Sequence, residues 1–153
     1  MSNQDIGSLV NRYIAVSFSV TKKAEALIKG TIESDELTCD QHYMLRYINN
    51  KGSCTSTELA EAFEVKKSAI TAIINRLYDK GLIVRTRDDN DRRVVYLTLT
   101  DQGKGLFDET EDKVHKLVES FIERFDEQEI KQFIETYEKL NQVLIEAKDN
   151  MEE

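Results

Sequence analysis

The stretch from Thr55 to Gly103 constrains the fold of this 153-residue chain more than any other. It opens with two short segments of helical character. The first, 55–63, begins with Thr55 and Glu58 at the spacing of a capping box, in which each side chain bonds the other residue's backbone N–H. The second, 66–80, is followed by Gly81, the residue type favoured just beyond a helix C-terminus. We therefore predict a helix-turn-helix over 55–80.

The second segment has two faces of opposite character. Branched apolar residues recur on one face at the helical period, which predicts that this face is buried: Ile70, Ile73, Ile74 and Leu77. The other face is short and polar, with Ser68, Thr71, Ala72 and Asn75 flanked by Ala69 and Arg76. Lys66 and Lys67 stand at the start. A helix with short polar side chains and a basic beginning suits the major groove of DNA.

Two β-rich runs, 82–87 and 94–99, follow at once. They bracket Asp88-Asp89-Asn90-Asp91, a cluster of turn-forming residues, so we predict a β-hairpin. The approaches to this turn carry four arginines: Arg85, Arg87, Arg92 and Arg93. A helix-turn-helix with a basic hairpin attached is a winged helix, and an arginine near the tip of such a wing can enter a minor groove.

This hairpin and its surroundings resemble the signature of the MarR family of bacterial transcription regulators. The matching residues run from Gly81-Leu82-Ile83 through Asp91-Arg92-Arg93 to Leu97-Thr98-Leu99-Thr100-Asp101-Gln102-Gly103. Leu37-Thr38 with Gln41, and Glu58-Leu59-Ala60, match upstream, so the resemblance covers essentially the whole chain. One departure is Asp89, which stands where many members carry proline, and we expect a looser wing turn as a result.

Long amphipathic segments flank the predicted winged helix. Apolar residues keep near-helical spacing over about 5–33 and about 104–148, whereas the DNA-binding lobe occupies about 37–100. Thr100 is the expected cap of the first C-terminal helix, and Asp126 with Glu129 is the expected start of the last one. A lone winged helix is too small to cover all this apolar surface, so we predict that both termini form a homodimer interface. The alternative is that these helices pack only within their own chain.

The charge of the chain is unevenly distributed. The net charge is −8, but residues 66–93 hold eight lysines or arginines against four aspartates. Charges farther apart than a Debye length of roughly 8–10 Å are screened at physiological salt, so the local basic strip decides the attraction to phosphate. An ordinary solvated surface is the alternative, but the basic residues coincide with the motif elements.

Length and composition favour one small domain over 1–153, mainly α with a small β-hairpin and without proline. The longest apolar runs, such as 13–16, are too short to span a bilayer, and no signal-peptide core follows the start. We therefore expect a cytoplasmic protein without membrane contact, with 149–153 as a frayed tail. No phosphate loop, nucleophile elbow or unexplained carboxylate pair is found, so we expect neither enzymatic activity nor a cofactor.

The cysteines and histidines carry weaker expectations. Cys39 follows the expected N-cap of a helix and could feel unpaired backbone N–H groups, so it is a candidate redox residue; the alternative is a small residue at a helix entry. Cys54 is expected to be inert in a loop, without a disulfide to Cys39. His42 and His115 lack the spacing of a metal motif, so no metal site is predicted. We expect His42 and Tyr43 to pack between the dimer helices and the DNA-binding lobe.

We interpret the chain as a homodimeric winged-helix transcription regulator, more in keeping with a repressor than with an activator. The residues expected in the major groove are Lys66, Lys67, Ser68, Thr71, Ala72, Asn75 and Arg76. Thr55, Ser56 and Thr57 are expected to hold phosphate at a helix start. Arg93 is expected in the minor groove, with Arg92, Arg85 and Arg87 on phosphate. The expected partner is double-stranded DNA with an inverted repeat.

The family resemblance implies two further features. Asp91 would orient the wing by pairing with an arginine, and a pocket between the dimer helices and the DNA-binding lobe would take a small-molecule effector, often an aromatic acid. An effector that binds better when the lobes are mis-spaced for DNA would release the operator by linkage. Two other interpretations stay open. One is a zinc- or thiol-gated repressor of the same fold, and the other is a winged helix that binds protein.

Overall fold

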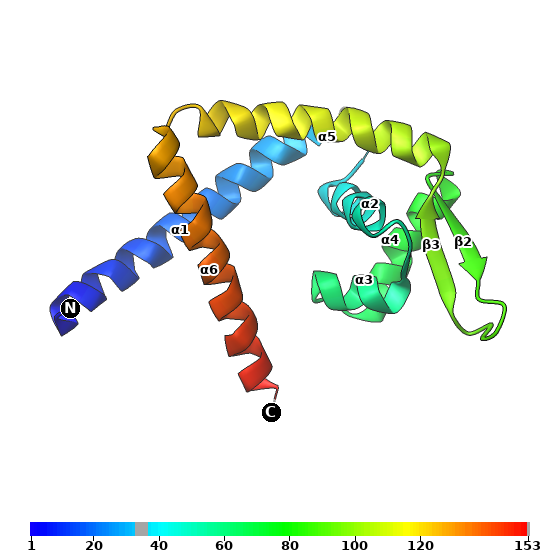
Figure 1. The fold of residues 1–153 in the computed structure, drawn as a ribbon, viewed down its shortest axis with the longest axis horizontal. Helices are drawn as coiled ribbons and strands as arrows, with labels where there is room; N and C mark the ends of the chain where they lie inside the picture. Colours follow the sequence, from blue (N-terminus) through cyan, green and yellow to red (C-terminus); the bar gives the residue numbers. More distant parts are fainter. Residues whose placement is uncertain (33–36, 153) are drawn as a thin grey trace. The chain divides into compact units, whose positions relative to one another are not determined.

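The computed structural model describes residues 1–32 and 37–152 (Figure 1). Its helices are α1 (Asn3–Ile32), α2 (Cys39–Lys51), α3 (Ser56–Phe63), α4 (Lys67–Asp79), α5 (Asp101–Ile122) and α6 (Glu127–Met151), and its strands are β1 (Cys54–Thr55), β2 (Ile83–Arg87) and β3 (Val95–Leu99). The chain divides into two compact units, 1–114 and 115–153, with α5 running from the first into the second. The predicted mainly α fold with a small hairpin is confirmed.

The hairpin belongs to a three-stranded antiparallel sheet with the order β1-β3-β2. β2 and β3 pair along their whole length, with Ile83 opposite Leu99, as the two β-rich runs predicted. β1 adds a pairing between Cys54 and Leu97. The prediction that Cys54 lies in a loop is therefore wrong. A strand of two residues has no measurable alternation, so the sequence could not distinguish it from a loop.

The core of the first unit draws on all the elements of the winged helix. Its buried residues include Leu45 and Ile48 from α2, Leu59 from α3, Ile70, Ile74 and Leu77 from α4, Leu82 and Ile83 at the start of β2, Leu97 from β3 and Phe107 from α5. The predicted buried face of α4 is confirmed, although Ile73 is only partly buried. Burial of this face fixes α4 against the hairpin and turns its polar side outward.

α4 ends in a Schellman motif, in which two backbone amides turn back to bond the last helical turn. The N–H of Gly81 donates to the carbonyl of Tyr78 (2.9 Å), and the N–H of Leu82 donates to that of Leu77 (3.0 Å). Gly81 has a φ of +73°, a left-handed conformation that glycine adopts without a steric penalty. The predicted place of Gly81 is confirmed, and the turn leads the chain straight from α4 into β2.

The junction between β3 and α5 is tied to the same turn. The Thr100 hydroxyl donates to the carbonyl of Gly81 (2.7 Å) and accepts from the N–H of Gly103 (2.9 Å), so Thr100 caps α5 as predicted. The N–H of Thr100 donates to the carbonyl of Leu82 (3.1 Å). Gly103 packs on that carbonyl so closely that a Cβ at residue 103 would lie 2.0 Å from its oxygen. These contacts hold the base of the hairpin against α5.

Capping by side chains explains two other helix starts. At α2 the Thr38 hydroxyl accepts from the N–H of Gln41 (3.2 Å), and the Gln41 side chain accepts from the N–H of Thr38 (3.3 Å), which completes a capping box. At α3 the Thr55 hydroxyl accepts from the N–H of Glu58 (3.2 Å), which is the threonine half of the predicted box.

The C-terminal helix corrects two predictions. Asp126 occupies the predicted N-cap of α6, but its side chain makes no cap hydrogen bond to the described residues, so only the position was right. α6 continues to Met151, so the predicted frayed tail is helical up to that residue, and Glu153 lies outside the described residues. Long helices can extend through a polar end because each added residue contributes one more backbone hydrogen bond.

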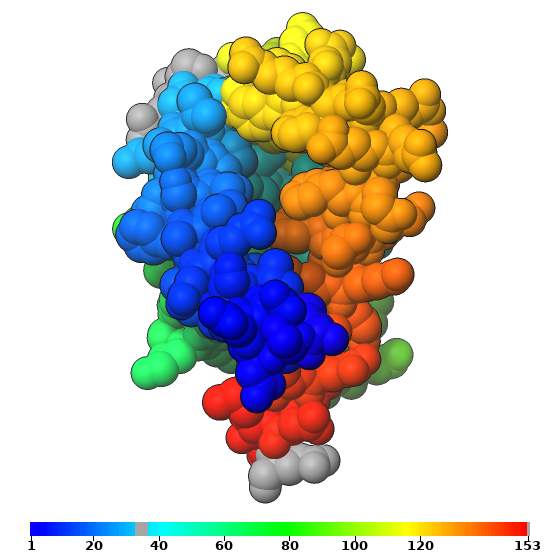
Figure 2. Space-filling model, turned by 90° about the vertical axis from the view of Figure 1, so that its left-hand side faces the viewer, coloured from blue at the N-terminus to red at the C-terminus, as the bar shows by residue number. Residues whose placement is uncertain are grey.

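The first helix, α1, leaves much of its apolar surface in contact with solvent. Phe18 is 68% exposed and Ile14 is 61% exposed, and Figure 2 shows the N-terminal half of α1 on the viewer's side. Across residues 1–32 and 37–152, no helix is both long enough and apolar enough to cross a membrane.

Candidate nucleic-acid interface

The outer face of α4 collects the side chains that were predicted to meet the major groove. Ser68, Ala69, Thr71, Ala72, Asn75 and Arg76 are all exposed. Lys66 is the N-cap of α4 and Lys67 is its first residue, so both lysines lie at the same end of the helix. The Thr71 hydroxyl donates to the carbonyl of Lys67 (2.8 Å) and can still accept a hydrogen bond from outside. α4 therefore offers one polar surface with a basic end.

The start of α3 provides a second polar element. Thr55 is its N-cap, and Ser56 and Thr57 are its first two residues. A helix N-terminus gathers backbone N–H groups and the positive end of the helix dipole, both of which favour a phosphate. The Thr55 oxygen accepts from Glu58, but its hydroxyl hydrogen can still be donated. A phosphate contact here stays a prediction.

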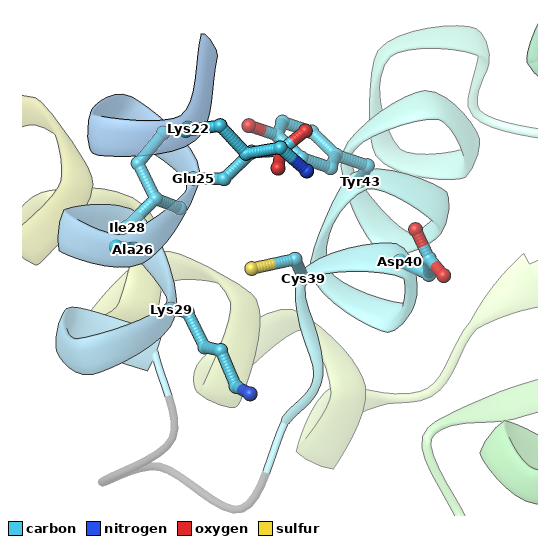
Figure 3. A pocket seen from close by; sticks show the side chains of 8 residues that line it. All are labelled: Lys22, Glu25, Ala26, Ile28, Lys29, Cys39, Asp40 and Tyr43. Carbon is cyan, nitrogen blue, oxygen red and sulfur yellow. The ribbon is translucent and has the colours of Figure 1, made fainter. Parts of the chain in front are cut away.

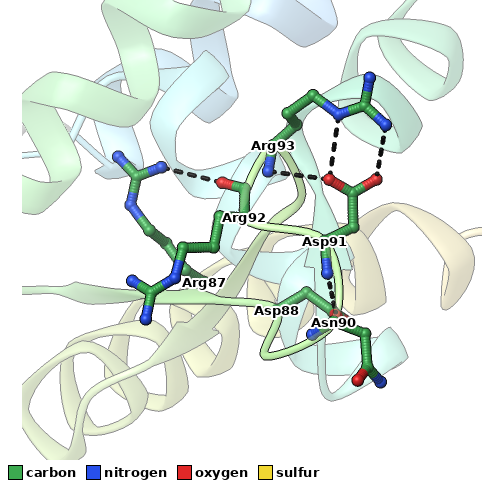
Figure 4. Close-up of polar contacts among 6 residues, drawn as sticks. All are labelled: Arg87, Asp88, Asn90, Asp91, Arg92 and Arg93. Atoms are coloured by element: carbon green, nitrogen blue, oxygen red, sulfur yellow. Dashed lines mark hydrogen bonds and ion pairs between the residues drawn. The ribbon is translucent and has the colours of Figure 1, made fainter.

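Asp88 organises the turn of the wing (Figure 4). Its carboxylate accepts hydrogen bonds from the N–H groups of Asn90 (2.8 Å) and Asp91 (3.0 Å), and its own N–H donates to the carbonyl of Val94 (2.9 Å). The two amide donors hold the pKa of the Asp88 carboxyl below its ordinary value. The side chain and the backbone of Asp88, the first residue of the turn, therefore both bond to later residues of the turn. The looser conformation expected from Asp89 stays a prediction.

Asp91 pairs with Arg93 at the far side of this turn. Its two carboxylate oxygens accept from the Nε (3.0 Å) and the terminal nitrogen (3.2 Å) of the Arg93 guanidinium, and one of them also accepts the Arg93 N–H (3.1 Å). The guanidinium lowers the pKa of the Asp91 carboxyl. The side chain of Arg93 is 91% exposed, so the pair holds the guanidinium in solvent. The pairing implied by the family resemblance is present, and its effect on DNA stays a prediction.

The two arginines of β2 are placed differently. Arg87 donates to the backbone carbonyl of Arg92 (2.9 Å), so it bridges the arms of the hairpin near the tip. Arg85 instead reaches α4, where its guanidinium lies over the ring of Tyr78 at 4.3 Å from the centroid and donates to the Oδ1 of Asn75. From the sequence we expected both arginines to contact phosphate, and Tyr78 was not among the predicted site residues. The three-residue spacing from Asn75 to Tyr78 places both on one face of α4, but it does not indicate that Arg85 contacts them.

A buried histidine links α2 to α5 within the first unit. The Nε2 of His42 lies 2.9 Å from one carboxylate oxygen of Glu111, and Arg46 donates to the other oxygen at 2.9 Å. His42 is fully buried, stacks on Phe107 with centroids 5.5 Å apart, and has no hydrogen-bond partner at Nδ1 among the described residues. Burial lowers the pKa of His42, although the Glu111 carboxylate opposes that shift. The packing role expected for His42 is supported, whereas Glu111 gave no signal in the sequence.

A cavity of about 430 Å³ lies between α1 and α2 (Figure 3). Its lining combines apolar surface with groups of both charges: Lys22, Glu25, Ala26, Ile28, Lys29, Cys39, Asp40 and Tyr43. The thiol of Cys39 and the ring of Tyr43 face α1 in this view. Cys39 is the first residue of α2 and is partly buried. A redox role for Cys39 stays a prediction.

Cys54 is buried within strand β1, and burial raises the pKa of its thiol to about 11. The thiol is therefore protonated at neutral pH, which supports the expectation that it is inert. Within the part of the chain that the structure describes, no group of three or more His, Cys, Asp or Glu side chains is placed to hold a metal ion.

Comparison with known proteins identifies the family. A profile of the MarR family matches residues 37–95. The HTH-type transcriptional repressor MdtR of Bacillus subtilis is 34% identical over 131 residues, which cover 85% of this chain and 84% of MdtR. The chain belongs to the MarR family. A crystal structure of a MepR-like protein with pseudoligands is 31% identical, with a TM-score of 0.65, and the match covers 88% of this chain and 95% of that one.

The fold also matches that of a MarR protein solved on DNA. A mutant of E. coli MarR complexed with operator DNA has a TM-score of 0.76 to this chain at 22% identity, covering 86% of this chain and 94% of the MarR chain. The winged helix-turn-helix predicted from the hairpin arginines and the α4 pattern is confirmed as the fold of this MarR family member. The chain is a DNA-binding transcription regulator of that family.

The buried His42 makes the stability of this MarR family protein depend on pH. The native chain holds His42 at a pKa below 6.5, whereas the unfolded chain binds that proton near 6.5. The unfolded state therefore binds more protons in this range, and the free energy of unfolding falls as the pH drops below about 6.5. The slope due to one proton cannot exceed about 1.4 kcal/mol per pH unit. We expect urea unfolding to show this decline in the wild type.

The variant His42→Gln isolates this contribution, because it removes the titrating ring while keeping a hydrogen-bonding side chain. We expect the wild type to lose more stability than His42→Gln between pH 7 and pH 5, even if the variant is less stable at pH 7. The carboxylates that titrate at lower pH are common to both proteins. Stabilisation of the wild type relative to the variant on acidification would mean that the Glu111 carboxylate outweighs burial, and would reverse the assignment.

Proposed function

We propose that this protein is a homodimeric, cytoplasmic repressor that binds an inverted-repeat operator and leaves it when a small molecule binds. α4 enters the major groove, with Lys66, Lys67, Ser68, Thr71, Ala72, Asn75 and Arg76 on the DNA side. Thr55, Ser56 and Thr57 hold phosphate, and Arg93 reaches the minor groove with Arg92 and Arg87 on the neighbouring backbone. No chemistry is performed on the DNA.

The observation that carries this proposal is the polar outer face of α4 beside a wing whose Arg93 is held in solvent by Asp91. A winged helix that binds protein would be expected to expose apolar side chains on the same face. Here the central positions Ser68, Thr71 and Asn75 are polar and exposed. The relative MdtR is a repressor, which favours repression over activation.

The cavity between α1 and α2 is the proposed effector site. Tyr43, Ala26 and Ile28 supply apolar surface for a ring. Lys22 and Lys29 supply positive charge for a carboxylate, beside the acidic Glu25 and Asp40 of the same lining. This combination fits a small aromatic acid, and the MepR-like structure was solved with pseudoligands. In the operator complex the two DNA-binding lobes of the dimer have a fixed spacing. An effector that binds better at another spacing shifts the equilibrium between DNA-bound and free protein toward the free protein. The alternative is that oxidation of the Cys39 thiol, and not a small-molecule effector, controls release from the operator.

The operator can be obtained by sequencing genomic fragments that the purified protein retains. We expect an inverted repeat whose half-sites lie about one helical turn, or roughly 10 bp, apart, because two recognition helices are related by a two-fold axis. Footprinting should show protection on one face of the duplex. A short asymmetric site bound by one chain would contradict the proposal.

On that operator, two variants of the wing distinguish the orientation of the Arg93 guanidinium from the net charge of the wing. Arg93→Ala should weaken binding to most sequences and lower the salt slope by about one charge per subunit. Asp91→Ala should reproduce part of this loss, because its carboxylate no longer aims the guanidinium. Simple charge counting predicts the opposite, since removing an acid near phosphates should tighten binding. Tighter binding by Asp91→Ala would reject the orienting role, and unchanged binding by Arg93→Ala would reject the wing as a DNA contact.

A further inference from the structure

Arg85 is held against the recognition helix by two contacts. Its guanidinium lies over the ring of Tyr78, 4.3 Å from the centroid, and one terminal nitrogen donates to the Oδ1 of Asn75. Asn75 and Tyr78 are three residues apart on α4, so they lie on neighbouring positions of one helix face. A cation within about 6 Å of an aromatic ring is attracted to its face, so Tyr78 limits where the Arg85 side chain can go.

This arrangement fixes which way the Asn75 carboxamide points. A carboxamide has one acceptor atom and one donor group, whereas a guanidinium has only donors. The atom that Asn75 turns toward Arg85 must therefore be its oxygen. The amide NH2 group of Asn75 (Nδ2) then points away from Arg85.

The orientation of this amide matters for reading bases. Asparagine recognises adenine through two bonds, donating to N7 and accepting from the N6 amine. In this protein a base amine would have to share the Asn75 oxygen with a positively charged guanidinium, which repels the hydrogens of the amine. Guanine presents two acceptors in the major groove, N7 and O6, and thymine presents O4. An Asn75 that can only donate matches those edges better than it matches adenine.

We propose that Arg85 is a specificity-determining positioning residue, which orients Asn75 so that it selects a guanine or thymine edge over adenine in each half-site. The proposal rests on the proposed function, because it requires α4 to face the major groove. It replaces the phosphate role that the sequence suggested for Arg85. The arginine acts through Asn75 and does not itself touch the DNA.

Base preference in each half-site is the direct readout. Competition among operators that carry each of the four bases at every half-site position should show one position at which the wild type prefers guanine or thymine to adenine by about fivefold or more. Arg85→Ala should reduce this ratio toward one at that position and leave the other positions unchanged. Asn75→Ala should have the same effect, and adding Arg85→Ala to Asn75→Ala should change the ratio no further.

Arg87→Ala is the matched control, because Arg87 lies two residues along β2 and is likewise exposed, but bonds the carbonyl of Arg92. We expect it to weaken binding to all sequences alike and to reduce the salt dependence. A uniform loss of the same kind for Arg85→Ala would overturn the proposal, because it would make Arg85 a phosphate contact. A wild-type preference for adenine at the position sensitive to Asn75→Ala would overturn it as well.

A measurement without DNA separates this inference from the proposed function. In the free protein, the nuclear magnetic resonance signals of the Asn75 side-chain amide should move in Arg85→Ala and stay in place in Arg87→Ala. If they move but the wild type binds no double-stranded DNA, the proposed function fails and the specificity role fails with it, although the contact stands. If the wild type binds its operator but the Asn75 signals do not respond to Arg85→Ala, the positioning role alone is wrong.

Discussion

Gly103→Ala is expected to lower the free energy of unfolding by about 3 kcal/mol, at the upper end of the cost of overpacking. A Cβ at this position would lie 2.0 Å from the carbonyl oxygen and 2.9 Å from the carbonyl carbon of Leu82. Both atoms belong to the backbone, so no rotamer change can relieve the clash. The turn after α4 and the first turn of α5 would have to separate, which would break the Thr100 bonds to Gly81, Leu82 and Gly103.

Gly105→Ala is the matched control, because Gly105 follows Gly103 by two residues in the same helix, and a Cβ placed there would have no described atom beyond its own helix within 4 Å. In a helix interior this change should stabilise the protein by up to about 1 kcal/mol. Thermal unfolding should therefore place Gly103→Ala about 6–12 °C below the wild type and Gly105→Ala at or above it. Equal melting temperatures for the two variants would show that the contact with Leu82 does not constrain the junction.

The sequence was most informative where structure is set by neighbouring residues. The T-x-x-E spacing at Thr55, the glycine after α4 and the threonine before α5 each act within one helical turn, and each predicted position is confirmed. The two strands of the hairpin were predicted within one residue of their observed ends. Local hydrogen bonding and hydrophobic period are properties of a short window, and a single sequence contains that window completely.

Contacts between residues far apart in the chain were missed, because no short window of sequence contains both partners. His42 and Glu111 are 69 positions apart, so nothing in a local pattern joins them. Arg85 looks like Arg87 in the sequence, and only the packing of β2 against α4 shows that one reaches Asn75 whereas the other bonds Arg92. The two residues of β1 were likewise unpredictable, because the partner of Cys54 is Leu97, far along the chain.

The C-terminal helix α6 exposes large apolar side chains on one face. On α6, Phe133, Tyr137 and Leu144 recur on one face of the helix and are 55%, 59% and 54% exposed. Phe133 and Tyr137 stack on each other with centroids 5.4 Å apart, so this face is aromatic at one end. Large apolar side chains that gather exposed on one helix face are typical of an interaction site. We infer that a second copy of the chain covers it.

The double variant Phe133→Glu with Leu144→Glu tests this dimer. Both side chains are more than half exposed in the single chain, so in a monomer the change at Leu144 should alter stability by no more than about 0.5 kcal/mol. The change at Phe133 should cost up to about 1.5 kcal/mol, because it also removes the stack with Tyr137. In a dimer they would place four charges in an apolar interface, which is costly because the charges are desolvated without partners. Sedimentation should find the wild type near twice 17.7 kDa and the variant near 17.7 kDa.

The matched control is Gln128→Glu with Gln142→Glu, which adds the same charge to α6 on the side opposite Phe133 and Leu144. It should stay dimeric and keep its affinity for the operator. The apolar-face variant should lose operator affinity by about 100-fold or more, because two linked half-site contacts become two independent ones. Circular dichroism should show that the variant keeps its helices, which separates dissociation from unfolding. A wild type that sediments as a folded monomer, or an apolar-face variant that stays dimeric and binds normally, would refute the dimer interface at α6.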